Sequence, residues 1–423
     1  MSAETPLQHA EQSPTGANGA APLPYREFIG LCASLMASTA LAIDIVIPAM
    51  LLIGAALGTI DGNAAQWIIT AYVVPYACAQ LLFGPLTDRF GRRPILIVGM
   101  SIYALGSLGS IFADGFAALL IARAVAGFGA ASGRVAAVAL VRDCFAGRDM
   151  AAIMSIIMMV FMLVPIAAPA IGQVLIDLVN WQAIFIFMAF CGFVLVGWVA
   201  LRLPETLAVE NRQPLQVKSI ARAFVIVVSE RASLAYALAL AVFFGSLFGF
   251  INSAAQIFLE IYTLGSWFPV AFSAGAGFIA LSSLINARVV QRVGMRRLSH
   301  WSLVGFIIFG VVLSALSVLY DGRPPMLLFI AGTALMFFFF GFIGTNFNAM
   351  AMEPLGHHAG MASAVFGFLQ MGLAGVIGAF IGQLYNDTTI PLLLSFSICG
   401  VISLLFVLWG ERGVLFGTGP GRP

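Results

Sequence analysis

Residues 84–94 read Gly84-Pro85-Leu86-Thr87-Asp88-Arg89-Phe90-Gly91-Arg92-Arg93-Pro94. A long apolar segment precedes this stretch and another follows it, and each has about the 20 residues that a helix needs to cross a bilayer. A short, basic, glycine-bearing turn between two such segments must lie at a membrane surface. Because arginine collects on the cytoplasmic side of membrane proteins, the stretch is predicted to be a cytoplasmic turn.

The charges of this turn also indicate a conformational role. An acid beside a basic cluster can hold neighbouring loops together through charge-assisted hydrogen bonds. Such a lock would favour the outward-open state and break as the two sides of the molecule rock. The alternative is that the positive charges only set the topology. The candidate residues of this gate or lock are Gly84, Asp88, Arg89, Gly91, Arg92 and Arg93.

The composition excludes a water-soluble protein. Hydrophobic residues make up 61% of the chain and charged residues 9%, against about 25% charged in an ordinary soluble domain. The formal net charge is +2, and we expect no nucleic-acid partner. The five cysteines are scattered, with no spacing typical of a metal site or a disulfide framework. We therefore expect no metal and no cofactor.

Twelve segments are long and apolar enough to span a bilayer. The longest internal connection, 202–231, separates them into halves of six helices, at 28–201 and 232–409. Residues 1–27 are predicted to be a disordered cytoplasmic tail and 410–423 a second cytoplasmic tail. The expected spans lie near 28–57, 66–86, 95–113, 116–141, 150–176, 181–201, 232–260, 267–288, 301–319, 325–350, 359–385 and 390–409.

The distribution of basic residues predicts the orientation of this all-α polytopic membrane protein. The connections after the odd-numbered spans hold Arg323 as their one basic residue, whereas the opposite side carries 17 of the 20 arginines and lysines. That bias places both termini in the cytoplasm. The remaining two, Arg123 and Arg134, fall within the fourth span.

The chain resembles the Bcr/CflA branch of the major facilitator superfamily, the type of drug/proton antiporter that confers bicyclomycin and chloramphenicol resistance. The turn at 84–94 matches the superfamily's signature loop between its second and third helices. The resemblance extends over 28–409 and implies the major facilitator fold with 12 transmembrane helices. Four further stretches carry it: Asp44–Met50 in the first span, Arg123–Ala131 in the fourth, Pro165–Gln173 in the fifth and Leu203–Leu207 after the sixth.

The resemblance implies a proton-driven antiporter of the bacterial inner membrane that works as a monomer. In its antiporter motif, Pro165, Pro169 and Gly172 are expected to act as hinge residues. The chain departs from the family pattern in three places. Ala126 stands where the family usually has glutamine, Val164-Pro165 stands where the antiporter motif opens with glycine, and Leu51 replaces a second proline.

Asp44 is the one acid well inside a predicted span. An ionised carboxylate there costs roughly 2.5–3.5 kcal/mol on insertion scales, which suits a group that loads and releases a proton. A fixed, always-paired structural Asp is the alternative. Arg123 is expected to tune Asp44 electrostatically, or else to clamp neighbouring carbonyls. Arg134, eleven residues later on the same helix face, either contacts substrate or extends toward the cytoplasm.

The second half supplies uncharged hydrogen-bonding residues in place of charges. Asn252, Gln256, Asn346 and Gln370 are candidates for the substrate cavity. No nucleophile, acid–base pair or metal cluster occurs at membrane depth, so an enzyme is not expected. The sequence predicts a transporter that exchanges protons for small amphiphilic molecules across the lipid bilayer, by alternating access. A proton-coupled transporter of an endogenous metabolite is the alternative. Two arginines beside a single carboxylate favour neutral or weakly anionic substrates over permanent cations.

Overall fold

A computed structural model describes residues 23–59, 61–213 and 224–417. The described part contains twelve helices or helix pairs that are long and apolar enough to cross a membrane, which confirms the predicted number. The boundaries agree with the predicted ones to within a few residues. The spans are Tyr25–Ala56, Gly62–Phe90, Arg92–Ile111, Phe116–Cys144, Ala152–Leu178, Gln182–Arg202, Arg231–Ile261, Gly265–Val293, Met295–Leu319, Met326–Leu355, Ser363–Gln383 and Ile390–Gly410.

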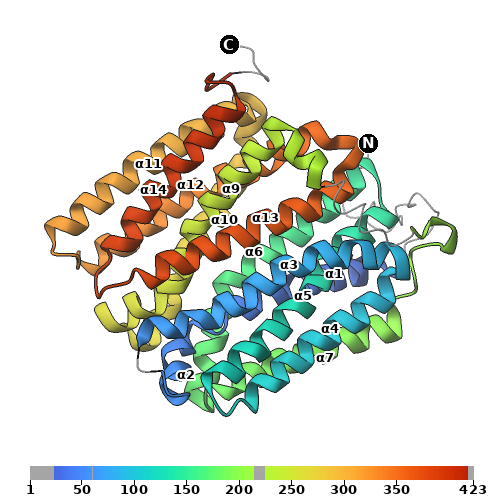
Figure 1. The fold of residues 1–423 in the computed structure, drawn as a ribbon, viewed down its shortest axis with the longest axis horizontal. Helices are drawn as coiled ribbons and strands as arrows, with labels where there is room; N and C mark the ends of the chain where they lie inside the picture. The colour runs from blue at the N-terminus through green and yellow to red at the C-terminus, as the bar shows by residue number, and fades with distance from the viewer. Residues whose placement is uncertain (1–22, 60, 214–223, 418–423) are drawn as a thin grey trace, which may run out of the picture.

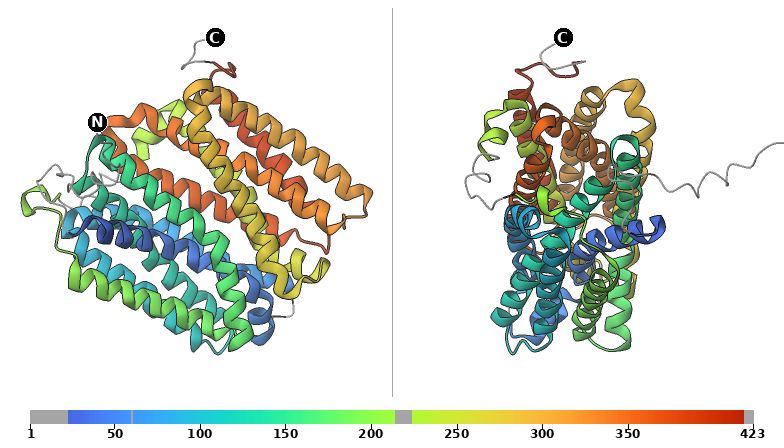
Figure 2. Two further views of the ribbon diagram at one scale, coloured as in Figure 1. Left: turned by 180° about the vertical axis from the view of Figure 1, so that it is seen from behind. Right: turned by 90° about the vertical axis from the view of Figure 1, so that its right-hand side faces the viewer.

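The spans form two groups of helices. Figure 1 shows α1, α3, α4, α5, α6 and α7 gathered on one side and α9 to α14 on the other, and Figure 2 shows the same division from two further directions. Most of the two predicted tails and the middle of the predicted linker, at 1–22, 418–423 and 214–223, lie outside the described residues. The bounds are α1 (Tyr25–Asp44), α3 (Trp67–Phe90), α4 (Arg92–Ile111), α5 (Phe116–Cys144), α6 (Gly147–Leu178), α7 (Gln182–Arg202), α9 (Arg231–Ala255), α10 (Phe268–Val293), α11 (Met295–Leu319), α12 (Met326–Met352), α13 (Ala359–Gln383) and α14 (Ile390–Gly410).

The prediction of an eleven-residue turn at 84–94 is wrong in the length of the turn. Helix α3 continues to Phe90 and α4 begins at Arg92, so the connection is Gly91 alone, with φ of +101°. Pro94 lies in the first turn of α4, where a backbone N–H has no helical acceptor and its absence costs nothing. The helices therefore run through residues whose composition is typical of a turn.

Among the described helices, two pairs make the largest contacts between the halves. Helix α3 packs against α13, and α6 packs against α10; Figure 1 shows α13 alongside α3. The α3–α13 pair is antiparallel and closely spaced along its length, because a Cβ added to a glycine on α13 would meet a residue that moves steadily along α3. The opposed positions are Gly382 with Gln66, which directly precedes α3, Gly375 with Val73, Gly372 with Ala77 and Gly367 with Gln80, and Gly84 on α3 faces Ala364.

The first span is interrupted where the prediction had one helix. Helix α1 ends at Asp44, a 3-10 turn η2 covers Ile47–Ala49, and α2 (Met50–Ala56) completes the span. Pro48 explains the break, because it has no N–H to donate to the carbonyl of Asp44 four residues earlier. The matching first span of the second half ends in a π-helix, η5, at Gln256–Ile261. Such π segments are rare and often lie at functional sites.

Candidate functional site

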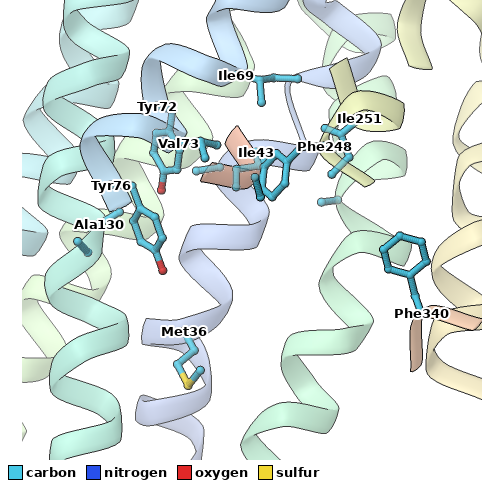
Figure 3. Close-up of a cluster of buried hydrophobic side chains, with 14 of the residues drawn as sticks. Met36, Ile43, Ile69, Tyr72, Val73, Tyr76, Ala130, Phe248, Ile251 and Phe340 are labelled. Carbon is cyan, nitrogen blue, oxygen red and sulfur yellow. The ribbon is translucent and has the colours of Figure 1, made fainter. Parts of the chain in front are cut away.

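Asp44 is the carboxylate at the break in the first span. Its residue is 4% exposed, and its side chain has no hydrogen bond or ion pair to any residue that the structure describes. The neighbouring Ile43 belongs to a cluster of buried apolar side chains that includes Val73 of α3 and Phe248 of α9, shown in Figure 3. The acid predicted to carry the proton therefore lies unpaired beside apolar packing contributed by both halves.

Arg123 does not form an ion pair with Asp44 in this structure. Its Nη2 donates to the carbonyl of Ala42 at 2.8 Å and its Nε to the carbonyl of Ile68 at 3.2 Å. The guanidinium also lies over the ring of Tyr72, 4.6 Å from the centroid. Ala42 carries one of the last four carbonyls of α1, which have no helical partner. The geometry is the carbonyl clamp that the sequence left as an alternative, and it holds the end of α1 beside α3.

The fully buried guanidinium of Arg123 keeps one free donor. Its Nη1 has no hydrogen-bond partner, and the hydroxyls of Tyr72 and Tyr103 are buried without one as well. Figure 3 shows Tyr72 and Tyr76 on the same side of α3. Arg134, the other arginine of α5, is half-buried, and no described residue bonds to it.

The substrate-cavity candidates of the second half differ in their hydrogen bonding. The Nδ2 of Asn346 donates to the Oδ1 of Asn286 on α10 at 2.9 Å and to the carbonyl of Phe342 at 2.8 Å, so it serves packing within that half. Asn252 is buried and its Oδ1 is unpartnered. Gln370 on α13 is half-buried, with no bond to any residue described.

Gln256 belongs to a hydrogen-bond network that joins the two halves at one end of the molecule. Its Oε1 accepts from the Nε2 of Gln66 at 2.5 Å, and its Nε2 donates to the Oδ1 of Asn63 at 2.7 Å. Asn63 in turn donates to the carbonyl of Tyr385 at 3.0 Å, and Gln383 donates to the carbonyl of Asn63 at 2.7 Å. We call these residues the amide network. The end of the molecule where it lies, which also holds Asp61, Glu260 and Asp387, is called the acidic end.

The opposite end, where α3 meets α4 and both described termini lie, is called the basic end. There Arg92 donates to Asp88 at 2.5 Å and to Asp143 at 2.9 Å, with its side chain 3% exposed. The carboxylate of Glu205 accepts from the backbone N–H of Arg92 at 2.9 Å and of Arg93 at 3.2 Å, so it caps α4. The predicted lock residues that bond here therefore tie together helix ends of the first half.

Gly91 is required by this cluster for two reasons. Its positive φ is a conformation that side chains rarely adopt, and a Cβ at this position would lie 2.3 Å from the Oε2 of Glu205. Gly84 is the predicted lock residue that faces the second half, because a Cβ added there would lie 3.9 Å from the Cβ of Ala364. Arg89 is exposed, and it has no bond within the described part of the chain.

The basic end of the second half has the same arrangement. Arg296, at the start of α11, bonds to Glu411 at 2.8 Å and to Glu353 at 3.5 Å. In both halves an arginine at the start of the third helix meets one acid at the end of the fourth helix and another just after the sixth. The acid after the sixth helix bonds to the backbone N–H of Arg92 in the first half and to the guanidinium of Arg296 in the second. Asp143, Glu353 and Glu411 were not singled out from the sequence, and Glu205 appeared only as part of the stretch Leu203–Leu207. Their repeated placement beyond matching helices was the available signal.

The antiporter-motif helix α6 touches both the break in the first span and the other half. A Cβ at Gly172 would lie 2.2 Å from the carbonyl oxygen of Ile45, next to Asp44. The hydroxyl of Ser273 on α10 donates to the carbonyl of Ile166 at 2.8 Å. Pro165 and Pro169 flank this contact within α6, so the two predicted hinge prolines lie where α6 meets α10.

A family model described as Major Facilitator Superfamily matches residues 31–379. The chain belongs to the major facilitator superfamily. This membership confirms the family resemblance and the major facilitator fold that were predicted from the sequence. It also agrees with the prediction of a multi-pass membrane protein. It also makes the chain a transporter of small molecules rather than an enzyme.

Similar members of the superfamily come from bacteria. A bicyclomycin resistance protein homolog of Haemophilus influenzae is 30% identical over 86% of this chain and 90% of its own. Multidrug resistance protein D of Escherichia coli is 28% identical over 88% and 92%. A chloramphenicol resistance protein of Pseudomonas aeruginosa is 30% identical over 82% of both chains.

A solved structure supports the major facilitator fold. The crystal structure of the human organic anion transporter TETRAN superposes with a TM-score of 0.67, over 92% of this chain and 100% of that one. The sequence identity is 17%, so the likeness concerns the arrangement of helices alone.

Proposed function

We propose that this major facilitator is a proton-coupled exporter of small amphiphilic molecules in the bacterial inner membrane. The observation that carries the proposal is Asp44, a buried carboxylate without a partner among the described side chains, at a helix break against both halves. Relatives named for bicyclomycin, chloramphenicol and multidrug resistance supply the class of cargo. The basic end faces the cytoplasm, so that both termini are inside, and the transporter works as a monomer.

The proposed cycle alternates access around Asp44. The amide network and the α3–α13 packing close the acidic end in the present state. Opening that end lets a proton reach Asp44 from outside, and protonation displaces bound substrate. Opening the basic end releases the proton to the cytoplasm and admits new substrate. Gly172 and the prolines of α6 provide the bending positions beside Asp44.

One proton per cycle is sufficient for resistance. At 100 mV it carries about 2.3 kcal/mol electrically, and one pH unit adds about 1.4 kcal/mol. Together these two contributions support a concentration gradient on the order of several hundred-fold for a neutral substrate.

The charges near the proposed site favour uncharged cargo. Arg123 is fully buried and Arg134 half-buried on the same helix, against the single carboxylate of Asp44. A permanent cation entering between them meets net repulsion in a low-dielectric setting, where a few kcal/mol is easily reached. Neutral, zwitterionic or weakly anionic amphiphiles are therefore the proposed substrates.

A drug panel in an efflux-deficient host tests the proposal. The wild-type chain is expected to protect against chloramphenicol-like compounds more than against ethidium or tetraphenylphosphonium, and Asp44→Asn to abolish protection. Asp177→Asn is the matched control, because Asp177 is exposed and bonds only within α6, to Gln173. Equal protection by wild type and Asp44→Asn would contradict proton coupling through Asp44. Proton flux driven by one metabolite and by none of the drugs would instead identify a metabolite transporter.

A further inference from the structure

Gln80 carries a buried amide at the contact between the halves. It takes no part in the proposed proton coupling or in the amide network. It lies on α3, its residue is 2% exposed, and its Nε2 has no hydrogen-bond partner. Across from it on α13 stands Gly367, where an added Cβ would lie 2.3 Å from the Oε1 of Gln80. The missing side chain at 367 therefore leaves the space that the amide occupies while α3 and α13 are packed together.

An unsatisfied amide donor in a closed apolar contact destabilises that contact, and a leucine would fill the same volume without this cost. Buried polar groups in folded proteins nearly always have partners, so an exception needs an explanation. The contact between α3 and α13 lies between halves that separate during transport. The Nε2 of Gln80 lacks a partner while α3 and α13 are packed together. A ligand that binds when the two helices separate would supply that partner.

The surroundings of Gln80 define the chemistry of that partner. Helix α3 carries no charged residue from Trp67 to Thr87, and α13 carries none along its whole length. A charged ligand would have no counter-ion on either helix, whereas a carbonyl, hydroxyl or nitro oxygen would accept from the free Nε2. Gln370 lies three residues beyond Gly367 on α13, half-buried and without a bond to the described residues, and offers a second amide nearby.

We propose that Gln80 and Gln370 form a substrate subsite across the α3–α13 contact, which takes a neutral amphiphile through an acceptor oxygen. The inference rests on the proposed export function and names a contact for its cargo. Gln80 supplies the donor, Gly367 holds its amide in the closed state, and the charge-free helix faces exclude ionised ligands.

The test uses the purified full chain in detergent, with chloramphenicol as the probe. Two quantities are measured for each variant: the dissociation constant and the melting temperature without ligand. Gln80→Leu is expected to weaken binding about tenfold while the melting temperature stays the same or rises, because the substitution removes an unsatisfied donor. Gly367→Ala is expected to lower the melting temperature, because the added methyl group would meet the Oε1 of Gln80 in the packed contact. Gln173→Leu is the control, because the amide of Gln173 is already bonded to Asp177.

An affinity of Gln80→Leu for chloramphenicol within twofold of the wild-type value would overturn the inference. A melting temperature that falls together with the affinity would also overturn it, because it would show that Gln80 serves helix packing. Absence of chloramphenicol binding by the wild-type chain would also overturn it. The export panel separates this failure from that of the proposed function. Export that depends on Asp44, combined with unchanged affinity in Gln80→Leu, contradicts the subsite alone, whereas export of no compound contradicts the function.

Discussion

The Nε2 of Gln66 lies 2.5 Å from the Oε1 of Gln256, and this contact joins the first half to the second at the acidic end. Gln66 also donates to the carbonyl of Gly382 at 3.0 Å, and Gly382 has no space for a Cβ beside it. The closure on this side is thus made by neutral amides and backbone carbonyls. The contact between Gln66 and Gln256 itself should not depend on the external pH, since neither amide titrates.

Gln256→Glu should make this closure depend on pH. The ionised carboxylate cannot donate to the Oδ1 of Asn63, as the native amide does, and repels it. At low pH the protonated acid regains a donor. The open population at the acidic end should therefore rise with pH more steeply in the variant than in the wild type.

Spin labels at Asp61→Cys and Asp387→Cys, in a background without the native cysteines, would report this opening as a longer interspin distance. Both positions are exposed and belong to opposite halves. The same pH response in wild type and variant would contradict the role given to the amide network.

Gly91→Ala should destabilise the protein by about 1–3 kcal/mol, the range for residues held in sparsely populated backbone conformations. The added methyl group would also push the Glu205 carboxylate away from the N-terminus of α4. Thermal unfolding in detergent measures the effect. Gly115→Ala is the control, because φ there is −167° and no atom lies within 4 Å of an added Cβ. Equal melting temperatures for the two variants would show that Gly91 is not required.

Arg92→Ala and Asp88→Asn should have different consequences. Arg92 is almost fully buried, and its loss leaves Asp143 without its ionic partner, so a cost of about 3–5 kcal/mol is expected. The Asp88 side chain is 38% exposed, and Asp88→Asn should leave stability nearly unchanged while it slows turnover more than it weakens binding. Melting temperatures together with transport rates and dissociation constants separate the two effects. Loss of affinity in Asp88→Asn at an unchanged rate would contradict the proposed lock.

The sequence predicted the twelve spans because each needs only a run of apolar residues. It also singled out Asp44 and Arg123 as candidates, because ionisable residues are rare at membrane depth. It did not predict the break at Asp44, although Pro48 was visible, since proline is often tolerated within membrane helices. The sequence left a carbonyl clamp by Arg123 as an alternative but could not name its acceptors, because these are backbone atoms of Ala42 and Ile68, far away in the chain.

The amide network and the cap by Glu205 were missed for a related reason. Gln66, Gln256 and Glu205 are ordinary polar residues at span ends, and only the packing of distant helices brings their partners to them. The antiparallel contact of α3 with α13 likewise determines that Gln80 faces Gly367. Such pairings follow from tertiary structure, whereas hydropathy and charge bias report on each segment separately.

Proton release on substrate binding is a direct measure of the competition between substrate and proton at Asp44. The purified chain is placed in weakly buffered detergent solution with a pH indicator, and chloramphenicol is added. Because substrate and proton compete through Asp44, the wild type and Asp177→Asn should release protons, up to one per molecule, and Asp44→Asn should release none while it keeps the wild-type melting temperature. Proton release of wild-type size from Asp44→Asn would contradict the account.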